Sequence, residues 1–458
     1  MRLKRHLLTA ALALFCLSAA NAQLLRTTVE QGEIEGVEHE GFALYKGIPY
    51  AEAPVGNLRW KAPVSKKPWK GVFKADKWGD RPPQPIDPNQ NGGELGMSED
   101  CLYLSVETPA KSKNDKLPVF VMIHGGAFLT GSYSGTQESF VKEGIIYCSI
   151  EYRLGALEFM AHPELNKESG KNISGNYGIL DQVMALKWIH DNIAAFGGDP
   201  DKITIAGESA GGISVSILCA SPLAKGLFRG AISESGSSFW PNVDGYSITD
   251  DQYKLYEKGN YNDVNVIIGT NSDEGSMFSR PVSVSDYEKR IHEIYGSWAD
   301  QVLSLYPAKT EEETYFAQSD IFRDGSFAWG TYAWANLQSK TGKGKVYMYY
   351  FDQDSENTIM KSRKGGASHV AEMPFIYGYK FGSGKMTETE QHMEQIMSRY
   401  WINFTKTGNP NGNSLPFWAT YQEGKPTVMI MKEGLHLGPV QNQKQMDFFE
   451  KFFKEKRK

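Results

Sequence analysis

The sequence predicts one large α/β domain. Three short runs rich in apolar and β-branched residues, 118–123, 203–206 and 264–268, each lead into a turn of small residues. A continuous apolar run of this kind is typical of a parallel strand that is buried on both faces. The second run is followed at 212–218 by a segment with the character of a helix, and no low-complexity linker divides the chain. These features favour a single sheet that collects the strands, with helices between them.

Residues 1–22 have the pattern of a secretory signal peptide. Three basic residues lie within the first five positions, an apolar run covers 7–17, and the Ala-Asn-Ala at 20–22 has the spacing of a cleavage site. No later stretch has the roughly 18 uninterrupted apolar residues that indicate a membrane span. We therefore expect a single domain over 23–458 that is secreted, to a periplasm or outside the cell, without membrane insertion.

Charge and residue spacing disfavour several classes of function. Loss of the three basic residues in the signal segment would take the formal net charge from −5 to −8, and no basic stripe offsets it. Nucleic-acid and anionic-membrane partners are therefore disfavoured. Neither a C-x-x-C nor an H-E-x-x-H spacing occurs. We expect no metal or organic cofactor.

The predicted strand 118–123 runs into a glycine-rich loop at 124–128, with the sequence HGGAF. Glycine lets successive backbone N–H groups point at one spot without a side chain between them. The loop is similar to the HGG-type loop that supplies oxyanion donors in lipases and esterases. We expect the N–H groups of Gly126 and Ala127 to be such donors, and His124 to hold the loop rather than to carry protons.

The pentapeptide Gly-Glu-Ser-Ala-Gly at 207–211 lies between the predicted strand 203–206 and the predicted helix 212–218. A serine between two glycines at such a turn is the pattern of a nucleophile elbow, which exposes the hydroxyl at the positive end of the helix dipole. A serine hydroxyl is a weak nucleophile at neutral pH, so it needs a base, an orienting acid and oxyanion donors. We expect Ser209 to be the nucleophile and the N–H group of Ala210 to be a third donor.

The orienting acid is expected after a later strand. The run 264–268 is followed by a loop at 269–275 that contains two adjacent carboxylates, Asp273 and Glu274. A loop can turn either side chain toward the serine, so the local pattern leaves both open.

The base must be one of the nine histidines. His292 and His392 lie in polar or helix-like contexts, which leaves His369 and His436 after the acid loop, in the order Ser, Asp or Glu, His that this arrangement uses. His369 follows small residues at 365–368, which can form a loop that brings the ring to the serine. His436 lies in a segment that resembles a β-strand, so local context favours His369.

Together these features resemble the type B carboxylesterases, the family that includes the cholinesterases and the bacterial para-nitrobenzyl esterases. Both signatures of that family are present, one across 196–212 and the other, EDCLYLSV, at 99–106. Further segments match in the family's order, at 45–51, 152–155, 175–178, 401–404 and 408–411. The resemblance covers nearly all of the mature chain. It implies an α/β-hydrolase fold, with a large, mostly parallel central sheet and helices on both faces.

The resemblance also implies the roles of the site residues. The acid is the glutamate of an Asp-Glu-Gly loop, here Glu274, and the base opens the motif HVAEMPF, here His369. Ser235 falls where relatives keep a serine that supports these residues. The implied activity is that of a secreted serine carboxylesterase, which hydrolyses small-molecule carboxylic esters through an acyl-enzyme on Ser209.

The chain departs from the family in three places. Relatives pair a cysteine with the one matched by Cys101, but the corresponding region at 81–84 has none, so we expect no structural disulfide. The segment between Gly236 and Gly245 is shorter than in most relatives, where helices help to line the acyl side of the pocket. Asn91 replaces the tryptophan that faces the cation in cholinesterases, which disfavours a choline substrate.

The sequence also predicts the structural role of two segments outside the motifs. The proline-rich tract at 82–88 is predicted to form part of the rim of the site. At 446–454 phenylalanines recur at helical spacing, which indicates a docking helix rather than a membrane anchor.

Two alternative functions remain. An acetyl or feruloyl esterase that acts on polysaccharides is compatible with a site opened by the short segment after Gly236. A non-catalytic binding protein on the same fold is disfavoured, because such relatives typically lack the serine or the histidine and this chain has both.

Overall fold

The structure is a computed structural model that describes residues 24–85, 96–236, 242–381 and 385–458. The predicted signal peptide at 1–22 and the position of Asn91 lie outside these ranges. So does 237–241, which is part of the segment that is expected to be shorter than in relatives.

Fourteen strands are found within the described residues. Their bounds are β1 Arg26–Val29, β2 Gly32–Glu35, β3 Val37–His39, β4 Phe42–Pro49, β5 Val72–Lys74, β6 Tyr103–Thr108, β7 Leu117–Ile123, β8 Ile146–Ile150, β9 Gly198–Glu208, β10 Gly230–Glu234, β11 Asn265–Asn271, β12 Val346–Phe351, β13 Val428–Met431 and β14 His436–Gly438. The predicted strands at 118–123, 203–206 and 264–268 correspond to β7, β9 and β11.

Helices connect the successive strands from β7 to β13. The α-helices are α2 Glu138–Lys142, α3 Pro163–Glu168, α4 Tyr177–Asn192, α5 Ala210–Ala220, α6 Gln252–Glu257, α7 Val284–Tyr295, α8 Ala299–Leu305, α9 Glu311–Phe322, α10 Trp329–Thr341, α11 Met373–Tyr377, α12 Glu388–Thr407 and α13 Gln443–Lys456. A π-helical turn, η7 Arg323–Ala328, joins α9 to α10, and a short 3₁₀ turn, η5 Ser276–Phe278, follows β11. None of the helices in the described ranges is both long and apolar enough to cross a bilayer.

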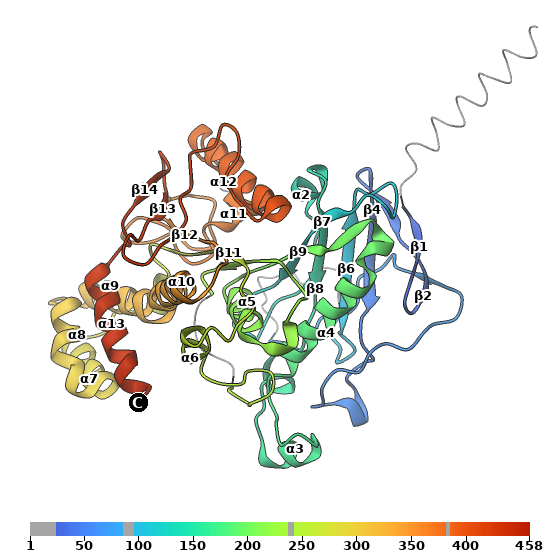
Figure 1. The fold of residues 1–458 in the computed structure, drawn as a ribbon. Coiled ribbons are helices and arrows are strands. Elements are labelled where there is room, and N and C mark those ends of the chain that lie inside the picture. Colours follow the sequence, from blue (N-terminus) through green and yellow to red (C-terminus); the bar gives the residue numbers. More distant parts are fainter. Residues whose placement is uncertain (1–23, 86–95, 237–241, 382–384) are drawn as a thin grey trace, which may run out of the picture.

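In the described residues one large sheet has the strand order β14-β13-β12-β11-β10-β9-β7-β8-β6-β4-β3 (Figure 1). The run from β13 to β8 is parallel throughout. Antiparallel strands close both edges, β14 on one side and β6, β4 and β3 on the other. Strands β1, β2 and β5 form a small separate sheet. The prediction of a mostly parallel central sheet is therefore confirmed.

Alternate residues of the central strands are buried in opposite layers. In β7, Val119 and Val121 belong to one apolar cluster, and Phe120 and Met122 belong to another. The first cluster includes residues of α4, α5, α6 and α10, and the second includes residues of α2, α11 and α12. In Figure 1, α11 and α12 lie above the sheet, while α4, α5 and α6 lie below it. Burial on both faces explains why β7 is apolar at almost every position.

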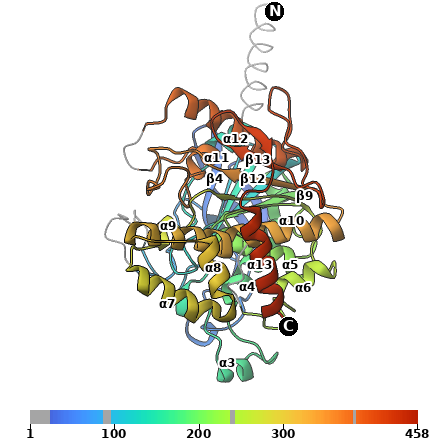
Figure 2. The ribbon, with the colours of Figure 1, turned by 90° about the vertical axis from the view of Figure 1, so that its left-hand side faces the viewer.

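The helices α7, α8, α9 and α13 gather at one end of the molecule, on the left in Figure 1 and toward the viewer in Figure 2. The predicted docking helix at 446–454 is confirmed as α13, which buries Phe448, Phe449 and Phe452. Phe453 packs on Trp329 of α10 with ring centroids 4.2 Å apart. Helix α9 of this group packs against the turn η5, which follows β11.

Helix α5 starts directly at the end of β9 and lies close to β10. A Cβ atom on Gly212 would come within 2.7 Å of the carbonyl oxygen of Glu234 and 2.8 Å of the Cα atom of Gly236. Both of these are backbone atoms, which cannot move aside without displacing the end of the strand. The absence of a side chain at position 212 therefore permits this approach of the helix.

We predict that Gly212→Ala destabilises the fold, because the added carbon must push α5 away from β10. Overpacking of this kind costs about 1–3 kcal/mol of unfolding free energy, measurable by urea denaturation. Gly438→Ala in β14 is a matched control, since its new Cβ would meet only the flexible Ile430 side chain, at 3.0 Å. Equal unfolding midpoints for the two variants would contradict the prediction.

Candidate active site

Ser209 occupies the turn between β9 and α5 in a backbone conformation that few residues adopt. Its φ of 56° and ψ of −123° lie outside the regions that are ordinarily open to a non-glycine residue. The neighbouring backbones leave no room for side chains: a Cβ on Gly211 would lie 2.0 Å from the carbonyl oxygen of Ile123. The N–H group of Ser209 donates to the carbonyl oxygen of Glu234, at 2.9 Å. The geometry is that of the predicted elbow.

The glycine-rich loop after β7 lies beside this serine. A Cβ on Gly125 would be 3.3 Å from the Cβ of Ser209. Gly126, Ala127 and Phe128 have φ values of 100°, 56° and 58°, so the loop curls back on itself in the left-handed region. Ala210 is the first residue of α5, and an N–H group at that position has no acceptor within its own helix.

His124 lies at the base of this loop. Its Nδ1 is 2.9 Å from the carbonyl oxygen of Gly125, and its Nε2 is 2.8 Å from Oε1 of the buried Glu151. The ring stacks on Tyr152 with centroids 4.4 Å apart, and the Tyr152 hydroxyl donates to the carbonyl oxygen of His124. These contacts anchor the loop and agree with the structural role expected for this histidine.

His369 lies between Ser209 and Glu274. The Nε2 atom of the imidazole is 2.9 Å from the Oγ atom of Ser209, and Nδ1 is 2.6 Å from Oε2 of Glu274. His369 and Glu274 are buried, and Ser209 is partly exposed. Three side chains from distant parts of the sequence therefore form one continuous hydrogen-bonded chain.

Of the two candidate acids, the structure turns Glu274 toward the histidine. Its other oxygen, Oε1, accepts hydrogen bonds from the Ser235 hydroxyl at 2.5 Å and from the N–H group of Asn271 at 2.7 Å. Asp273 points elsewhere and accepts from the Ser319 hydroxyl at 2.7 Å. Ser235 therefore contacts the acid, as the family resemblance implied.

Backbone contacts between two loops set this arrangement. The N–H group of Asp273 donates to the carbonyl oxygen of Ala367 at 2.8 Å, and the N–H group of Ala367 donates to the Ser272 hydroxyl at 2.8 Å. The Asn271 amide adds a bond to the carbonyl oxygen of Ser368 at 2.9 Å. The acid and the histidine are thus joined through the residues that directly precede them.

His436, the alternative base, lies on the edge strand β14 and is exposed. Five strand positions separate β14 from β9 in the sheet, which at the usual spacing between strands is roughly 24 Å. The structure therefore does not bring His436 to Ser209.

Sequence reasoning missed three further buried carboxyl groups, of which those of Glu208 and Glu372 act on the histidine. The Oε1 atom of Glu208 lies 3.3 Å from Nε2 of His369, and Glu372 accepts a hydrogen bond from the Asn271 amide. Glu234 accepts bonds from the hydroxyl of Tyr377 and the indole of Trp401. A local signal existed for two of them: Glu208 directly precedes the serine, and Glu372 follows the histidine by one helical turn.

Burial and mutual repulsion set the charge of this group. Desolvation raises the pKa of Glu208, Glu234 and Glu372, and their negative neighbours raise it further. Burial by itself would lower the pKa of His369, but the carboxylates of Glu208 and Glu274 outweigh it and raise that pKa above the ordinary value. These carboxylates therefore make the imidazole a stronger base than a free histidine.

Aromatic rings and a proline-rich segment border the site. Phe327 stacks on the His369 ring with centroids 5.2 Å apart, and Phe278 approaches it edge-on at 5.6 Å. Gln84, in the predicted rim, exchanges two hydrogen bonds with the backbone of Gly131 at the end of the glycine-rich loop. Part of the predicted rim, 86–88, lies outside the described residues.

The cysteines lie away from this site. Cys101, Cys148 and Cys219 are buried, free thiols, and Cys16 lies outside the described residues. Pro82 and Pro83, in the region where relatives keep the partner cysteine, line a small cavity together with Cys101. Within the described ranges, no group of three or more His, Cys, Asp or Glu side chains is placed to hold a metal ion.

Comparison with known proteins gives one consistent result. The model of the carboxylesterase family matches residues 23–241 and 237–449. The chain is 32% identical to para-nitrobenzyl esterase of Bacillus subtilis (strain 168), over 89% of this chain and 94% of that protein. It is 29% identical to fumonisin B1 esterase of Sphingopyxis macrogoltabida, over 87% of this chain and 85% of that protein. It is 30% identical to cocaine esterase of Homo sapiens, over 85% of this chain and 84% of that protein.

Solved structures agree with these relatives. A PNB esterase structure superposes with a TM-score of 0.80 at 30% identity, covering 93% of this chain and 99% of the other. A thermophilic PNB esterase gives a TM-score of 0.80 at 29% identity, with the same coverage.

We predict that Glu208→Gln lowers the pKa of His369. The glutamate carboxylate stabilises the imidazolium form, and an amide cannot replace its charge. The expected shift is about one pH unit, measured by NMR titration of protein labelled at histidine. Glu234→Gln is a matched control, because it removes a buried carboxyl group that does not contact the imidazole. An unchanged titration of His369 in Glu208→Gln would contradict the prediction.

Proposed function

Because the chain belongs to the carboxylesterase family, we propose that it hydrolyses carboxylic esters through an acyl-enzyme intermediate on Ser209. The type B carboxylesterase resemblance and the α/β-hydrolase fold expected from the sequence are confirmed by the family match and by the solved neighbours. The chain is thus a carboxylic ester hydrolase of the serine type. The observation that carries the proposed mechanism is the position of His369 between the serine hydroxyl and the Glu274 carboxylate.

In the first half of the reaction, Ser209 attacks the ester carbonyl while Nε2 of His369 takes its proton. Glu274 holds the ring by Nδ1 and stabilises the imidazolium that forms. The negative charge on the carbonyl oxygen is stabilised by the N–H groups of Gly126, Ala127 and Ala210. The imidazolium then gives its proton to the departing alcohol, which leaves the acyl group on the serine.

In the second half, the same residues act on water. Nε2 of His369 takes a proton from a water molecule as its oxygen attacks the acyl-enzyme, and the same donors stabilise the second tetrahedral intermediate. Return of the proton to Ser209 releases the carboxylic acid and restores the enzyme. Raised basicity of the imidazole supports both proton transfers.

The proposal extends to the place of action. The charged, apolar and small-residue regions within 1–22 support export by a signal peptide and a mature domain over 23–458. We propose that the enzyme acts on small-molecule esters in a periplasm or outside the cell.

Covalent labelling tests the nucleophile. We expect a fluorophosphonate probe to label the protein once, at Ser209, and Ser209→Ala to abolish labelling and lower p-nitrophenyl acetate hydrolysis by at least about 10³-fold. Ser214→Ala, one turn further along α5 and buried beside Gln182, is expected to retain both. An intact protein that stays unlabelled and hydrolyses no ester would refute the proposal.

We predict that Ser235→Ala lowers kcat by about tenfold with little change in KM, since a hydrogen bond to a charged, buried oxygen is lost. The matched control is Ser319→Ala, which removes an equivalent hydroxyl from Asp273 instead. Steady-state kinetics on p-nitrophenyl butyrate separates the two. Equal losses in both variants would assign Ser235 a role in folding rather than in holding Glu274.

A further inference from the structure

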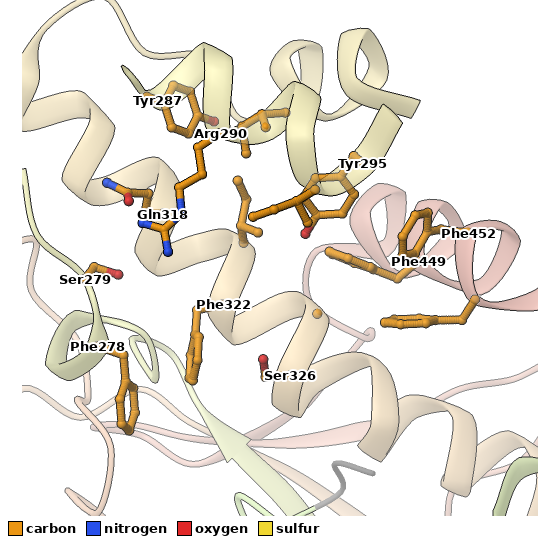
Figure 3. Close-up of a pocket in the computed structure, with 15 residues that line it drawn as sticks. Phe278, Ser279, Tyr287, Arg290, Tyr295, Gln318, Phe322, Ser326, Phe449 and Phe452 are labelled. Carbon is orange, nitrogen blue, oxygen red and sulfur yellow. The ribbon is translucent and has the colours of Figure 1, made fainter. Parts of the chain in front are cut away.

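A cavity of about 390 Å³ opens beside the active-site histidine. Phe278 lines it and also meets the His369 ring edge-on, so one aromatic side chain borders both spaces. Phe322 stacks on Phe278 with ring centroids 4.6 Å apart and continues the same wall (Figure 3). The cavity therefore adjoins the place where an ester would react, with the Phe278 ring between its lining and the imidazole.

The rest of the lining is mostly apolar. One side of the cavity is lined by three aromatic rings, those of Phe449 and Phe452 on α13 and of Tyr295 on α7. Figure 3 shows these rings on one flank and Phe278 on the other, with the helix that carries Phe322 between them. An extended hydrocarbon arm of a ligand would be removed from water in such a space, which favours its binding.

One cation, the exposed Arg290, lies at the rim of this apolar lining. Arg290 projects from α7 into the cavity, and its guanidinium lies near Gln318 of α9 (Figure 3). Among the described residues no carboxylate forms a salt bridge with Arg290, whereas Arg153 pairs with Asp181 and Arg323 with Asp324. An arginine that faces a cavity without an internal partner is available to a ligand.

We propose that this cavity binds one arm of the substrate, an extended apolar chain that ends in a carboxylate paired with Arg290. The inference rests on the proposed function, because the arm is taken to belong to an ester held at Ser209. A planar guanidinium matches a carboxylate through two parallel hydrogen bonds, and it remains charged at every working pH. The enzyme thereby selects half-esters of dicarboxylic acids or esters of hydroxy acids over purely apolar esters.

The main experiment compares esters of equal length. One pair is the mono-p-nitrophenyl ester of suberic acid and p-nitrophenyl octanoate, which differ in the far end of the acyl arm. The other pair is the butyrate ester of an ω-hydroxy acid and that of the alkanol of equal length, which differ in the alcohol arm. We expect the wild-type enzyme to prefer the carboxylate-ended member in one pair, which identifies the arm that occupies the cavity.

Variants assign that preference to a residue. The ratio of interest is kcat/KM for the carboxylate-ended ester divided by kcat/KM for the apolar ester of the same pair. Arg290→Gln should lower this ratio by about tenfold, mainly through KM, since the contact between the arginine and the carboxylate exists before and during the reaction. Arg290→Glu should reverse the preference in favour of an amine-ended ester. Lys289→Gln removes the same charge from the neighbouring position, where the lysine contacts Glu293 outside the cavity, and should leave the ratio unchanged.

The outcomes separate the two proposals. If the enzyme hydrolyses p-nitrophenyl butyrate but shows the same ratio in wild type, Arg290→Gln and Lys289→Gln, the cavity assignment is wrong and the esterase proposal stands. If no ester is hydrolysed, the esterase proposal fails. Calorimetric binding of suberic acid to Ser209→Ala, with and without Arg290→Gln, then tests the cavity alone. Binding that depends on Arg290 supports the assignment, and binding that is absent or independent of it overturns the assignment.

Discussion

The strained backbone at Ser209 is the constraint on which the rest of the site depends. Conformations of this kind cost about 1–3 kcal/mol and persist only where the surroundings over-determine them. Here the surroundings are backbone: Gly211 packs against the end of β7, and Gly212 packs against the end of β10. The central strands and the first turn of α5 therefore hold the serine hydroxyl at the edge of the sheet, close to the glycine-rich loop.

A second constraint is electrostatic. Four glutamates, Glu208, Glu234, Glu274 and Glu372, are buried, and three of them act on the imidazole of His369. Water cannot stabilise their charges there, so their protonation depends on one another and on His369. Glu274 is held by two hydrogen bonds to one oxygen while the other faces the ring, which gives this carboxylate the orienting position. Glu208 and Glu372 increase the basicity of the imidazole.

The helices at one end of the molecule add a different kind of surface. Helices α7, α9 and α13 line an apolar cavity next to Phe278. The aromatic wall formed by Phe278 and Phe322 lies between the cavity and the histidine. Residues far from the reacting atoms can therefore select an ester by its length and charge.

Much of the fold and of the site could be predicted from the sequence because the signals are local. A continuous apolar run predicts β7, glycines around a serine predict the elbow, and phenylalanines at helical spacing predict α13. Each of these patterns expresses the surroundings of a few consecutive residues. Family resemblance extended them by assigning Glu274 and His369 where the local patterns left two acids and two histidines open.

The tertiary structure decided what depends on residues far apart in the chain. Hydrogen bonds between the loops at Asp273 and Ala367 turn Glu274 inward, and the strand order carries His436 to the far edge of the sheet. The protonation of Glu208 and the cavity at Arg290 also follow from neighbours that the sequence does not place side by side. Burial and charge are properties of three-dimensional surroundings, whereas strand, turn and helix patterns are properties of consecutive residues.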